Sequence, residues 1–392
     1  MKKLILSMMF LSAGFFAISQ NEYKTVLQQI EANNTTLTAL REQMKSQKLN
    51  NRTGIYPDNP EVAFNYLWGS PALTGNRTDV SVQQSFDFPT VYVYRSKIAN
   101  LQNENTEMSY KSERMYLLLS AKQICIELIY YNALAKEYEA RLQNAERIAL
   151  AYKVKLEKGE TNILENNKAQ LNLTAIQTEI LEIETEQTAL LAELKRLNGG
   201  KDIAFSNNDY PTTTLPSNFD EWYTQVEAKS PAMQYLNGQI EINRQQVKLN
   251  RALGLPKFSA GYMSEKITGE HFQGVTVSMS IPLWGNKNNV KQAKAQVSAT
   301  EFALEDNKMQ VYSRLRNLYL KALTLQQNTQ KVRQSLSLYG NEPLLKKALD
   351  AGEISLLNYL QEIEYYYEAV NKALETERDF ELTVAELSAM EE

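Results

Sequence analysis

Length, composition and charge exclude several classes of protein. The 392-residue chain has 43% hydrophobic and 22% charged residues, so it can bury a core and is unlike a disordered chain. Its net charge of −4 provides no basic surface for nucleic acid, and its single cysteine excludes an intramolecular disulfide and a multi-cysteine metal site.

The first 19 residues have the layout of a signal peptide. Lysines at positions 2 and 3 precede an apolar run over residues 4–18, and we expect cleavage near Ser19-Gln20. A membrane anchor is the alternative, but the run is short for a bilayer span. Cleavage would remove two lysines and no acids, which changes the net charge from −4 to −6.

No later segment contains 18 consecutive apolar residues, so no transmembrane helix is expected in the mature chain. An exported chain of this kind can still enter an outer membrane as strands of a closed barrel.

The first structural repeat is expected over residues 20–200. A helical pattern ends near Asn51, and period-two alternation then predicts a hairpin over residues 61–88 with one apolar and one polar face. Residues 90–158 contain no Gly or Pro, so a helix from about residue 93 would span on the order of 100 Å. A second helix returns after Gly159, and the long helix pair covers residues 93–198.

The returning helix has the clearest seam in the chain. Its apolar positions are separated alternately by three and four residues, which is the spacing of a heptad seam. Only Gln187 interrupts it. The seam consists of Ala169, Leu173, Ile176, Ile180, Ile183, Gln187, Leu190, Leu194 and Leu197.

The same plan restarts after a polar linker, the equatorial segment at residues 201–221. The second repeat covers residues 222–392, with a helix, a hairpin at 257–283 and a long helix pair at 286–390 that is interrupted near Gly340. A shift of 195 residues aligns VTVSMSIPL with VSVQQSFDF, and Gly352-Glu353 repeats Gly159-Glu160. The chain is therefore an internal two-fold repeat of large units.

Four strands are too few to close a barrel, and helices of this length cannot form a compact globule. The pattern favours several chains side by side, whose hairpins form one barrel and whose helices form a tube. The expected fold is mainly α with a small β part. Long antiparallel coiled-coil helices would form a periplasmic tunnel, and each chain would contribute four strands to a shared outer-membrane β-barrel.

At this point the sequence resembles the TolC-type outer-membrane efflux protein family over essentially the whole mature chain. The resemblance is carried by the paired halves, by the joints Phe88-Pro89 and Ile281-Pro282-Leu283, and by the turns GETNILENNKAQLNL and GEISLLNYLQEIEYYYEA. The joint QSFDFPTVYVYRSKIA is similar to that of outer-membrane components of heavy-metal (Cus/Czc-like) RND efflux systems. The family implies a homotrimer in outer-membrane lipid, with a periplasmic adaptor (membrane fusion) protein and an inner-membrane pump docking at the tunnel tips.

The two helical turns are the candidate periplasmic tip, gate and adaptor-docking site. Related channels close partly with acidic residues after the second glycine, where this chain has Asn358 and Gln361 instead. Glu165 holds the corresponding position in the first turn, and a ring of such carboxylates would favour cations. The alternative is that these are ordinary solvated charges at helix ends. The candidate residues are Gly159, Glu160, Glu165, Asp350, Gly352, Glu353, Asn358 and Gln361.

A second candidate set consists of aromatic strand residues that would face lipid, with packing between neighbouring strands as the alternative. The set is Phe64, Tyr66, Trp68, Phe86, Phe258 and Tyr262.

The sequence contains no catalytic, cofactor-binding or metal-binding constellation. The single histidine, His271, falls in an expected outer loop, where a solvated residue is the simpler interpretation. We therefore expect no enzyme. The favoured function is an outer-membrane exit duct that passively conducts metal ions or drugs. The alternatives are a periplasmic coiled-coil adaptor or scaffold without a pore, and a type I protein-secretion duct.

Overall fold

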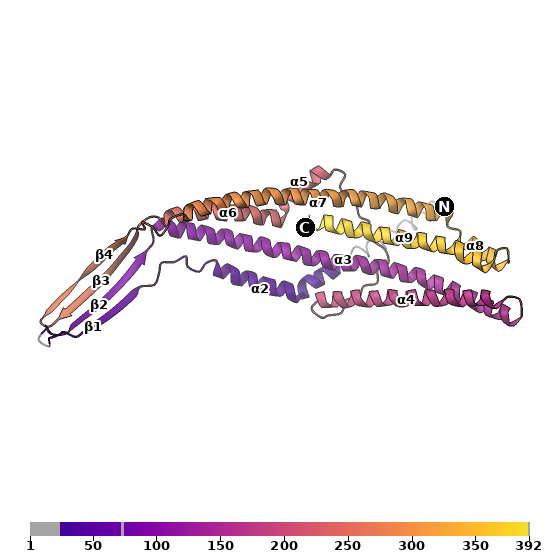
Figure 1. The fold of residues 1–392 in the computed structure, drawn as a ribbon, viewed down its shortest axis with the longest axis horizontal. Coiled ribbons are helices and arrows are strands. Elements are labelled where there is room, and N and C mark those ends of the chain that lie inside the picture. The colour runs from indigo at the N-terminus through magenta and orange to yellow at the C-terminus, as the bar shows by residue number, and fades with distance from the viewer. Residues whose placement is uncertain (1–23, 72–73, 391–392) are drawn as a thin grey trace, which may run out of the picture. The chain divides into compact units, whose positions relative to one another are not determined.

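The computed structural model describes residues 24–71 and 74–390, so the expected signal peptide lies outside the described residues (Figure 1). Helices predominate, and residues 24–33 are also helical. The elements are α2 (Thr35–Asn50), β1 (Glu61–Leu67), β2 (Arg77–Phe86), α3 (Pro89–Glu157), α4 (Ile163–Leu197), α5 (Phe219–Lys229), α6 (Pro231–Ala252), β3 (Lys257–Ile267), β4 (Glu270–Ser280), α7 (Asn289–Tyr339), α8 (Glu342–Asp350) and α9 (Leu356–Ser388).

The order of these elements confirms the predicted two-fold repeat. Helix, hairpin, long helix and returning helix follow one another twice, and the expected interruption of the second long helix separates α7 from α8. Pro343 lies in the first turn of α8, where the missing N–H of proline costs no hydrogen bond. Likewise, α3 begins at Pro89, four residues before the expected start near residue 93.

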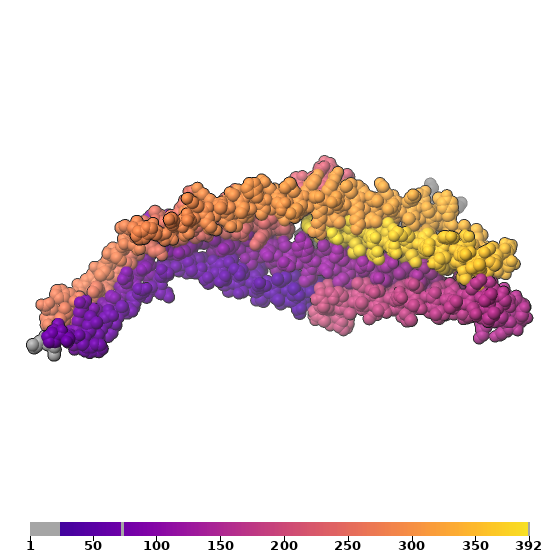
Figure 2. Space-filling view, viewed as in Figure 1, coloured from indigo at the N-terminus to yellow at the C-terminus, as the bar shows by residue number. Residues whose placement is uncertain are grey.

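The strands of the described residues form one antiparallel sheet in the order β1-β2-β3-β4. The two hairpins are joined through β2 and β3, in a register that pairs Val82 with Tyr262 and Phe86 with Phe258. Strands of the first and second repeats therefore lie side by side in the sheet, and Figure 2 shows their purple and orange atoms in contact at the left. The outer edges of β1 and β4 have no neighbouring strand within the described part of the chain.

The chain divides into two compact units, each of which contains parts of both repeats. The sheet unit comprises residues 40–112 and 227–311, and within the described part the helical unit comprises residues 24–39, 113–226 and 312–390.

In the sheet unit, the start of α3 packs against α6. Val91 and Ile98 of α3 are buried against Ile242 and Leu249 of α6. Farther along α3, the Asn105 side chain donates to a backbone carbonyl of α6 at 3.1 Å. These contacts join the helix that leaves the first hairpin to the helix that enters the second.

In the helical unit, the core lies where helix 24–33, α3, α4 and α9 meet. Ile30, Cys125 and Ile129 are fully buried there, together with Leu194 of α4 and Ala385 of α9. Cys125 is thus a small apolar core residue, and burial raises the pKa of its thiol to about 12. No helix in the described part of the chain is both long and apolar enough to span a membrane.

The predicted seam of α4 is confirmed, because each of its positions is buried or half-buried. Its one polar member has a specific partner: the amide of Gln187 donates to Asn132 Oδ1 of α3 at 2.7 Å. Asn132 in turn donates to the carbonyl of Asn207 at 2.9 Å. The break in the apolar pattern therefore marks a polar bridge from α4 through α3 to the linker.

Candidate functional site

The first helical turn is closed by a glycine in the left-handed conformation. Gly159 has φ +74° and ends α3, and its N–H donates to the carbonyl of Leu156 at 3.0 Å. The N–H of Glu160 donates to the carbonyl of Lys155 at 2.8 Å. This pair of bonds is the Schellman arrangement, which satisfies carbonyls at the end of a helix.

The second turn repeats this geometry closely. Gly352 has φ +76°, and its N–H donates to the carbonyl of Leu349 at 3.1 Å. The N–H of Glu353 donates to the carbonyl of Ala348 at 2.9 Å. A Cβ at Gly159 or Gly352 would meet nothing within 4 Å, so the backbone angle, not crowding, favours glycine at both turns.

The returning helices begin with matching caps. The side chain of Asn162 accepts the N–H of Glu165 at 3.0 Å, and the side chain of Ser355 accepts the N–H of Asn358 at 3.2 Å. Glu165 and Asn358 therefore occupy the same position, three residues after the cap, in the two turns. The matching caps support the alignment of the two turns, in which Asn358 occupies the position that Glu165 holds in the first turn.

The charged candidates differ in their surroundings. Glu165 is half-buried and forms an ion pair with Lys168 at 3.1 Å, whereas Glu160 and Glu353 are exposed. Asp350 forms an ion pair with Arg147 of α3 at 2.7 Å.

The two polar candidates of the second turn, Asn358 and Gln361, are both exposed. The second turn is therefore open to solvent at both of these positions.

A buried cluster holds the two turns together. Tyr359 of α9 is fully buried against Ile148 of α3, Ala169 of α4 and Leu349 of α8. Its hydroxyl accepts a hydrogen bond from the Asn144 side chain at 2.7 Å, and burial raises its pKa. The tips of the first and second helix pairs are thus one packed structure within the helical unit.

Beside this cluster, an arginine lies between two aromatic rings. The Arg141 guanidinium is 4.4 Å from the ring centre of Tyr138 and 4.2 Å from that of Tyr367, and it donates to Asn371 Oδ1 at 2.8 Å. Only 4% of Arg141 is exposed. Sequence reasoning missed this residue, because its partners on α9 are more than 200 positions away; the Tyr run at residues 365–367 was the available signal.

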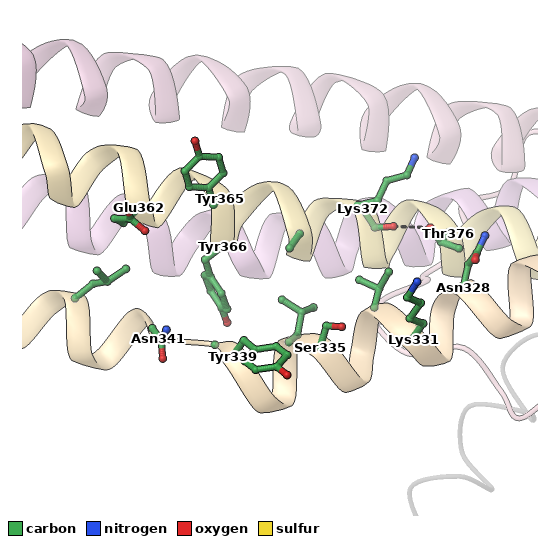
Figure 3. A pocket seen from close by; sticks show the side chains of 15 residues that line it. Asn328, Lys331, Ser335, Tyr339, Asn341, Glu362, Tyr365, Tyr366, Lys372 and Thr376 are labelled. Atoms are coloured by element: carbon green, nitrogen blue, oxygen red, sulfur yellow. Dashed lines mark hydrogen bonds between the residues drawn. The ribbon is translucent and has the colours of Figure 1, made fainter.

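A cavity of about 670 Å³ lies between α7 and α9, next to the end of α7. Tyr366 extends from α9 towards α7, Tyr339 lies along the end of α7, and Tyr365 is directed away from α7 (Figure 3). Small side chains, Ser335 of α7 and Ala369 of α9, line its middle.

The sheet collects most of the predicted lipid-facing residues on one face. Phe64 and Tyr66 of β1, Phe86 of β2, and Phe258 and Tyr262 of β3 share this face by strand register. The apolar face also includes Val80 and Val82 of β2 and Val275, Val277 and Met279 of β4. Trp68, the remaining member of the predicted set, follows the end of β1 and packs edge-on against Tyr66 at 5.6 Å.

The opposite face of the sheet is more polar. Gln83 of β2 donates to Ser259 of β3 at 2.8 Å, and Arg77 forms ion pairs with Asp79 at 2.8 Å and Glu265 at 3.2 Å. The expected division into an apolar and a polar face is confirmed by this register.

A charged contact fixes the point where the first hairpin becomes a helix. The Asp87 carboxylate lies between β2 and α3, with Arg95 of α3 at 2.9 Å and Lys257 of β3 at 3.0 Å. Its backbone N–H also donates to the Tyr92 hydroxyl at 2.9 Å. Three segments therefore converge on one side chain at the joint.

The described residues contain no group of three or more His, Cys, Asp or Glu side chains that could hold a metal ion. His271 lies within β4 and not in the loop that the sequence predicted, because strand pairing continues to Ile267 and Glu270. Its Nε2 shares a hydrogen bond with Ser264 Oγ at 2.8 Å.

The fold defines a class of protein. The chain matches a solved structure of CusC, a protein that forms a transmembrane channel. The match has a TM-score of 0.80 and 15% identity and covers 94% of this chain and 92% of that one. The outer membrane channel CmeC of Campylobacter jejuni matches with a TM-score of 0.76 and 16% identity, over 94% of this chain and 85% of that one. At such identities the likeness establishes the fold, which is that of the TolC-like outer-membrane channels.

Sequence comparison points to the same class of protein as the fold. Residues 222–390 match the family model described as "Outer membrane efflux protein". The alkaline protease secretion protein AprF of Pseudomonas aeruginosa is 22% identical over 77% of this chain, and the chain spans 66% of that protein's length, slightly less than two thirds. These matches confirm the expected resemblance to the TolC-type outer-membrane efflux proteins, in sequence over the second repeat and in fold over most of the chain.

Proposed function

We propose that the protein is the exit duct of a tripartite efflux system, which passively conducts metal ions or drugs from an inner-membrane pump and a periplasmic adaptor to the exterior. The observation that carries this proposal is the channel fold, which extends over 94% of the chain. The duct performs no chemistry, and the partner pump supplies the energy.

The sheet supports assembly into a homotrimer. A four-stranded sheet with two open edges cannot close on itself, whereas three copies supply enough strands for a barrel with the apolar face outward. Phe64, Tyr66, Phe86, Phe258 and Tyr262 would then contact outer-membrane lipid, with Trp68 at the interface. The signal peptide would be cleaved near Ser19-Gln20, and the helices would lie in the periplasm.

The two tips are the proposed gate and adaptor-docking site. Gly159 and Gly352 set matching turns, and Glu160, Glu165, Asp350 and Glu353 make the tips acidic. Three copies of these carboxylates would attract cations and repel anions. Asn358 and Gln361 contribute polar but uncharged groups, so selectivity for cations would come from the other positions.

The cargo separates two versions of this function. CusC and CmeC share the fold, whereas AprF is named for protease secretion, so a type I protein-secretion duct is the second candidate. A deletion strain distinguishes the two. An efflux duct predicts that the strain becomes sensitive to metals or drugs, whereas a secretion duct predicts that it fails to secrete a protein. A periplasmic scaffold without a pore is the third candidate, and it predicts no conductance at all.

The first experiment is membrane fractionation followed by conductance in planar bilayers. We expect a detergent-extracted outer-membrane trimer that forms cation-selective channels; a soluble protein without conductance would contradict the proposal. Glu165→Gln and Glu353→Gln test the gate. The control is Glu193→Gln, a half-buried glutamate that pairs with Arg196 near the other end of α4. Unchanged conductance and selectivity in both tip variants would remove the gate assignment but not the duct.

A further inference from the structure

An extended segment, which we name the strap (residues 201–218), crosses the helical unit without forming a helix or a strand. At its start, Lys201 donates to Asn33 at 2.6 Å and Asp202 pairs with Lys195 of α4 at 2.8 Å. Its next contacts are with α3. The carbonyl of Asn207 accepts a hydrogen bond from Asn132 at 2.9 Å, and the Tyr210 hydroxyl donates to the carbonyl of Ile126 at 3.1 Å. The strap is thus tied to α3 by two hydrogen bonds.

The strap then contacts two further helices. The Thr213 hydroxyl donates to Glu381 Oε2 of α9 at 3.0 Å, and the carbonyl of Pro216 accepts a hydrogen bond from the Tyr319 hydroxyl of α7 at 2.8 Å. These four strap residues, from Asn207 to Pro216, are three positions apart, which is the period of an extended polyproline-type backbone. One face of the strap therefore ties α3, α9 and α7 to one another.

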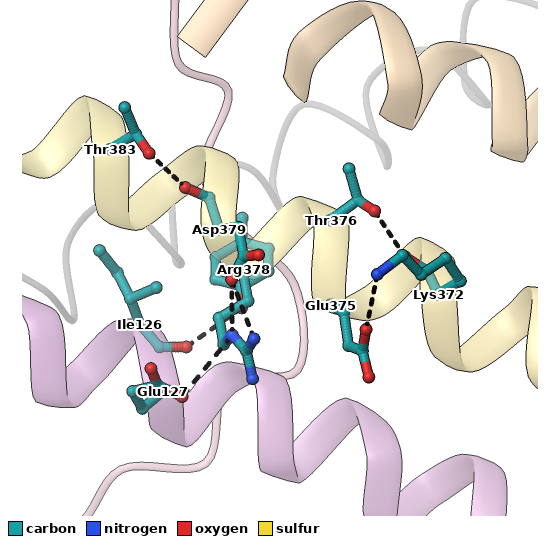
Figure 4. A network of polar contacts seen from close by, with 9 residues as sticks. Ile126, Glu127, Lys372, Glu375, Thr376, Arg378, Asp379 and Thr383 are labelled. Atoms are coloured by element: carbon teal, nitrogen blue, oxygen red, sulfur yellow. Dashed lines mark hydrogen bonds and ion pairs between the residues drawn. The ribbon is translucent and has the colours of Figure 1, made fainter. Parts of the chain in front are cut away.

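Among these four anchors, only the one at Glu381 includes a carboxylic acid. The cations around it are engaged by other groups. Arg378 of α9 forms ion pairs with Asp379 at 2.9 Å and Glu127 of α3 at 3.9 Å, and Lys122 of α3 donates to Ser388 at 2.9 Å. Figure 4 shows the Arg378 network beside the strap.

The remaining charged neighbour on α9 is itself acidic. Glu377 is paired with Arg333 of α7 at 2.5 Å, and it opposes a negative charge on Glu381. The groups that act on Glu381 are therefore Lys122 from α3, Glu377 from α9, and Thr213 and Tyr210 from the strap. Glu127 and Arg378 act on Tyr210 beside it.

Burial raises the pKa of Glu381 to about 7, and the Thr213 hydrogen bond and Lys122 offset this effect only in part. The carboxyl thus changes its charge in the neutral pH range. A single hydroxyl donor does not replace the hydration that an ionised carboxylate loses on burial, so the ionised side chain gains free energy when water reaches it.

We propose that the Thr213–Glu381 contact is a pH-dependent anchor of the strap. The anchor holds while the Glu381 carboxyl is protonated, and it opens when ionisation draws water between α9 and the strap. Because the strap also contacts α3 and α7, opening this anchor loosens the connection that the strap makes between the three helices. This inference does not depend on the conducted cargo or on the proposed gate.

Hydrogen–deuterium exchange of the full-length assembled protein, followed by mass spectrometry, tests the anchor. Peptides covering residues 207–218 are compared at pH 5.5 and pH 8.5, with exchange times corrected for the chemical rate. We expect several-fold faster corrected exchange at pH 8.5 in the wild type. Glu381→Gln should remain protected at both pH values, because the amide still accepts the Thr213 hydrogen bond and cannot ionise.

Two further variants make the test decisive. Thr213→Val removes the hydroxyl donor and should give fast exchange at both pH values, and it remains informative if Glu381→Gln does not assemble. Glu375→Gln, a half-buried position on the same helix that pairs with Lys372, should keep the wild-type pH dependence. Equal protection of the wild-type strap at both pH values, or a pH dependence that persists in Glu381→Gln or Thr213→Val, would overturn the proposal.

Discussion

Arg147 Nη1 lies 2.7 Å from Asp350 Oδ1, and this ion pair joins α3 of the first repeat to α8 of the second. Arg147 is 45% exposed at its side chain and Asp350 58%, so water screens the pair and its contribution to stability is at most about 1 kcal/mol. The pair nevertheless lies one turn from Gly352, where the second helix pair reverses. It is therefore placed to restrain the position of one tip without greatly stabilising the fold.

Arg147→Ala should increase the mean conductance or the open probability of channels in planar bilayers, because the second tip loses a tether to α3. The melting temperature should change little, as expected for an exposed pair. Lys195→Ala, which breaks the exposed pair with Asp202 away from the tips, is the matched control. Conductance that is equal in Arg147→Ala and the control would show that this pair does not restrain the tip.

Gly352→Ala should destabilise the helical unit by about 1 kcal/mol, because an L-residue at φ +76° is strained even where space is available. Chemical denaturation of the full chain measures the effect. Gly274→Ala is the control, since a Cβ there also meets nothing within 4 Å and the backbone is not left-handed. If Gly352→Ala is as stable as Gly274→Ala, the turn accommodates the side chain by a different backbone path.

Glu381 should make stability depend on pH. Burial raises its pKa from 4.5 to about 7, so between these values the folded protein retains a proton that the unfolded chain has lost. The stabilisation is complete below about pH 4.5 and is lost as pH rises through about 7, a difference of about 3 kcal/mol. Glu381→Gln should therefore melt higher than the wild type at pH 8 and close to it at pH 5; identical melting curves at pH 8 would contradict the predicted shift.

Periodic features of the fold were predictable from the sequence, because neighbours on one helix or strand determine them. The seam from Ala169 to Leu197 and the two faces of the hairpins follow from spacing alone. The matching turns at Gly159 and Gly352 also follow, since a glycine after a long helix is a local signal.

Contacts between distant segments could not be predicted. Asp87 and Lys257 are 170 positions apart, and Arg141 meets Asn371 across 230. The strap was read only as a polar linker, because its anchors depend on which helices it crosses. The break between α5 and α6 does have a local signal, the dipeptide Ser230-Pro231. Ser230 caps α6 by accepting the N–H of Met233 at 3.5 Å, and Pro231 begins that helix.

Asp87→Asn tests whether the charged contact at the strand-to-helix joint stabilises the sheet unit. Only 9% of the Asp87 side chain is exposed, whereas Arg95 is 29% and Lys257 54% exposed. Asparagine keeps the shape and one acceptor but not the charge, so each cation loses its partner. We expect a loss of about 1–3 kcal/mol, since a buried carboxylate loses its contacts with two cations and the half-buried Arg95 is left without its partner.

Denaturant unfolding of the full chain measures this loss, with hydrogen exchange of residues 77–100 locating it at the joint. Asp202→Asn is the control, because Asp202 is 88% exposed in its pair with Lys195 and should change stability by less than about 0.5 kcal/mol. The second repeat has Pro282 at the position that aligns with Asp87, so it has no acid to perform the same role. An Asp87→Asn protein with unaltered stability and exchange would mean that packing alone, chiefly Val91 against Leu249, fixes the joint.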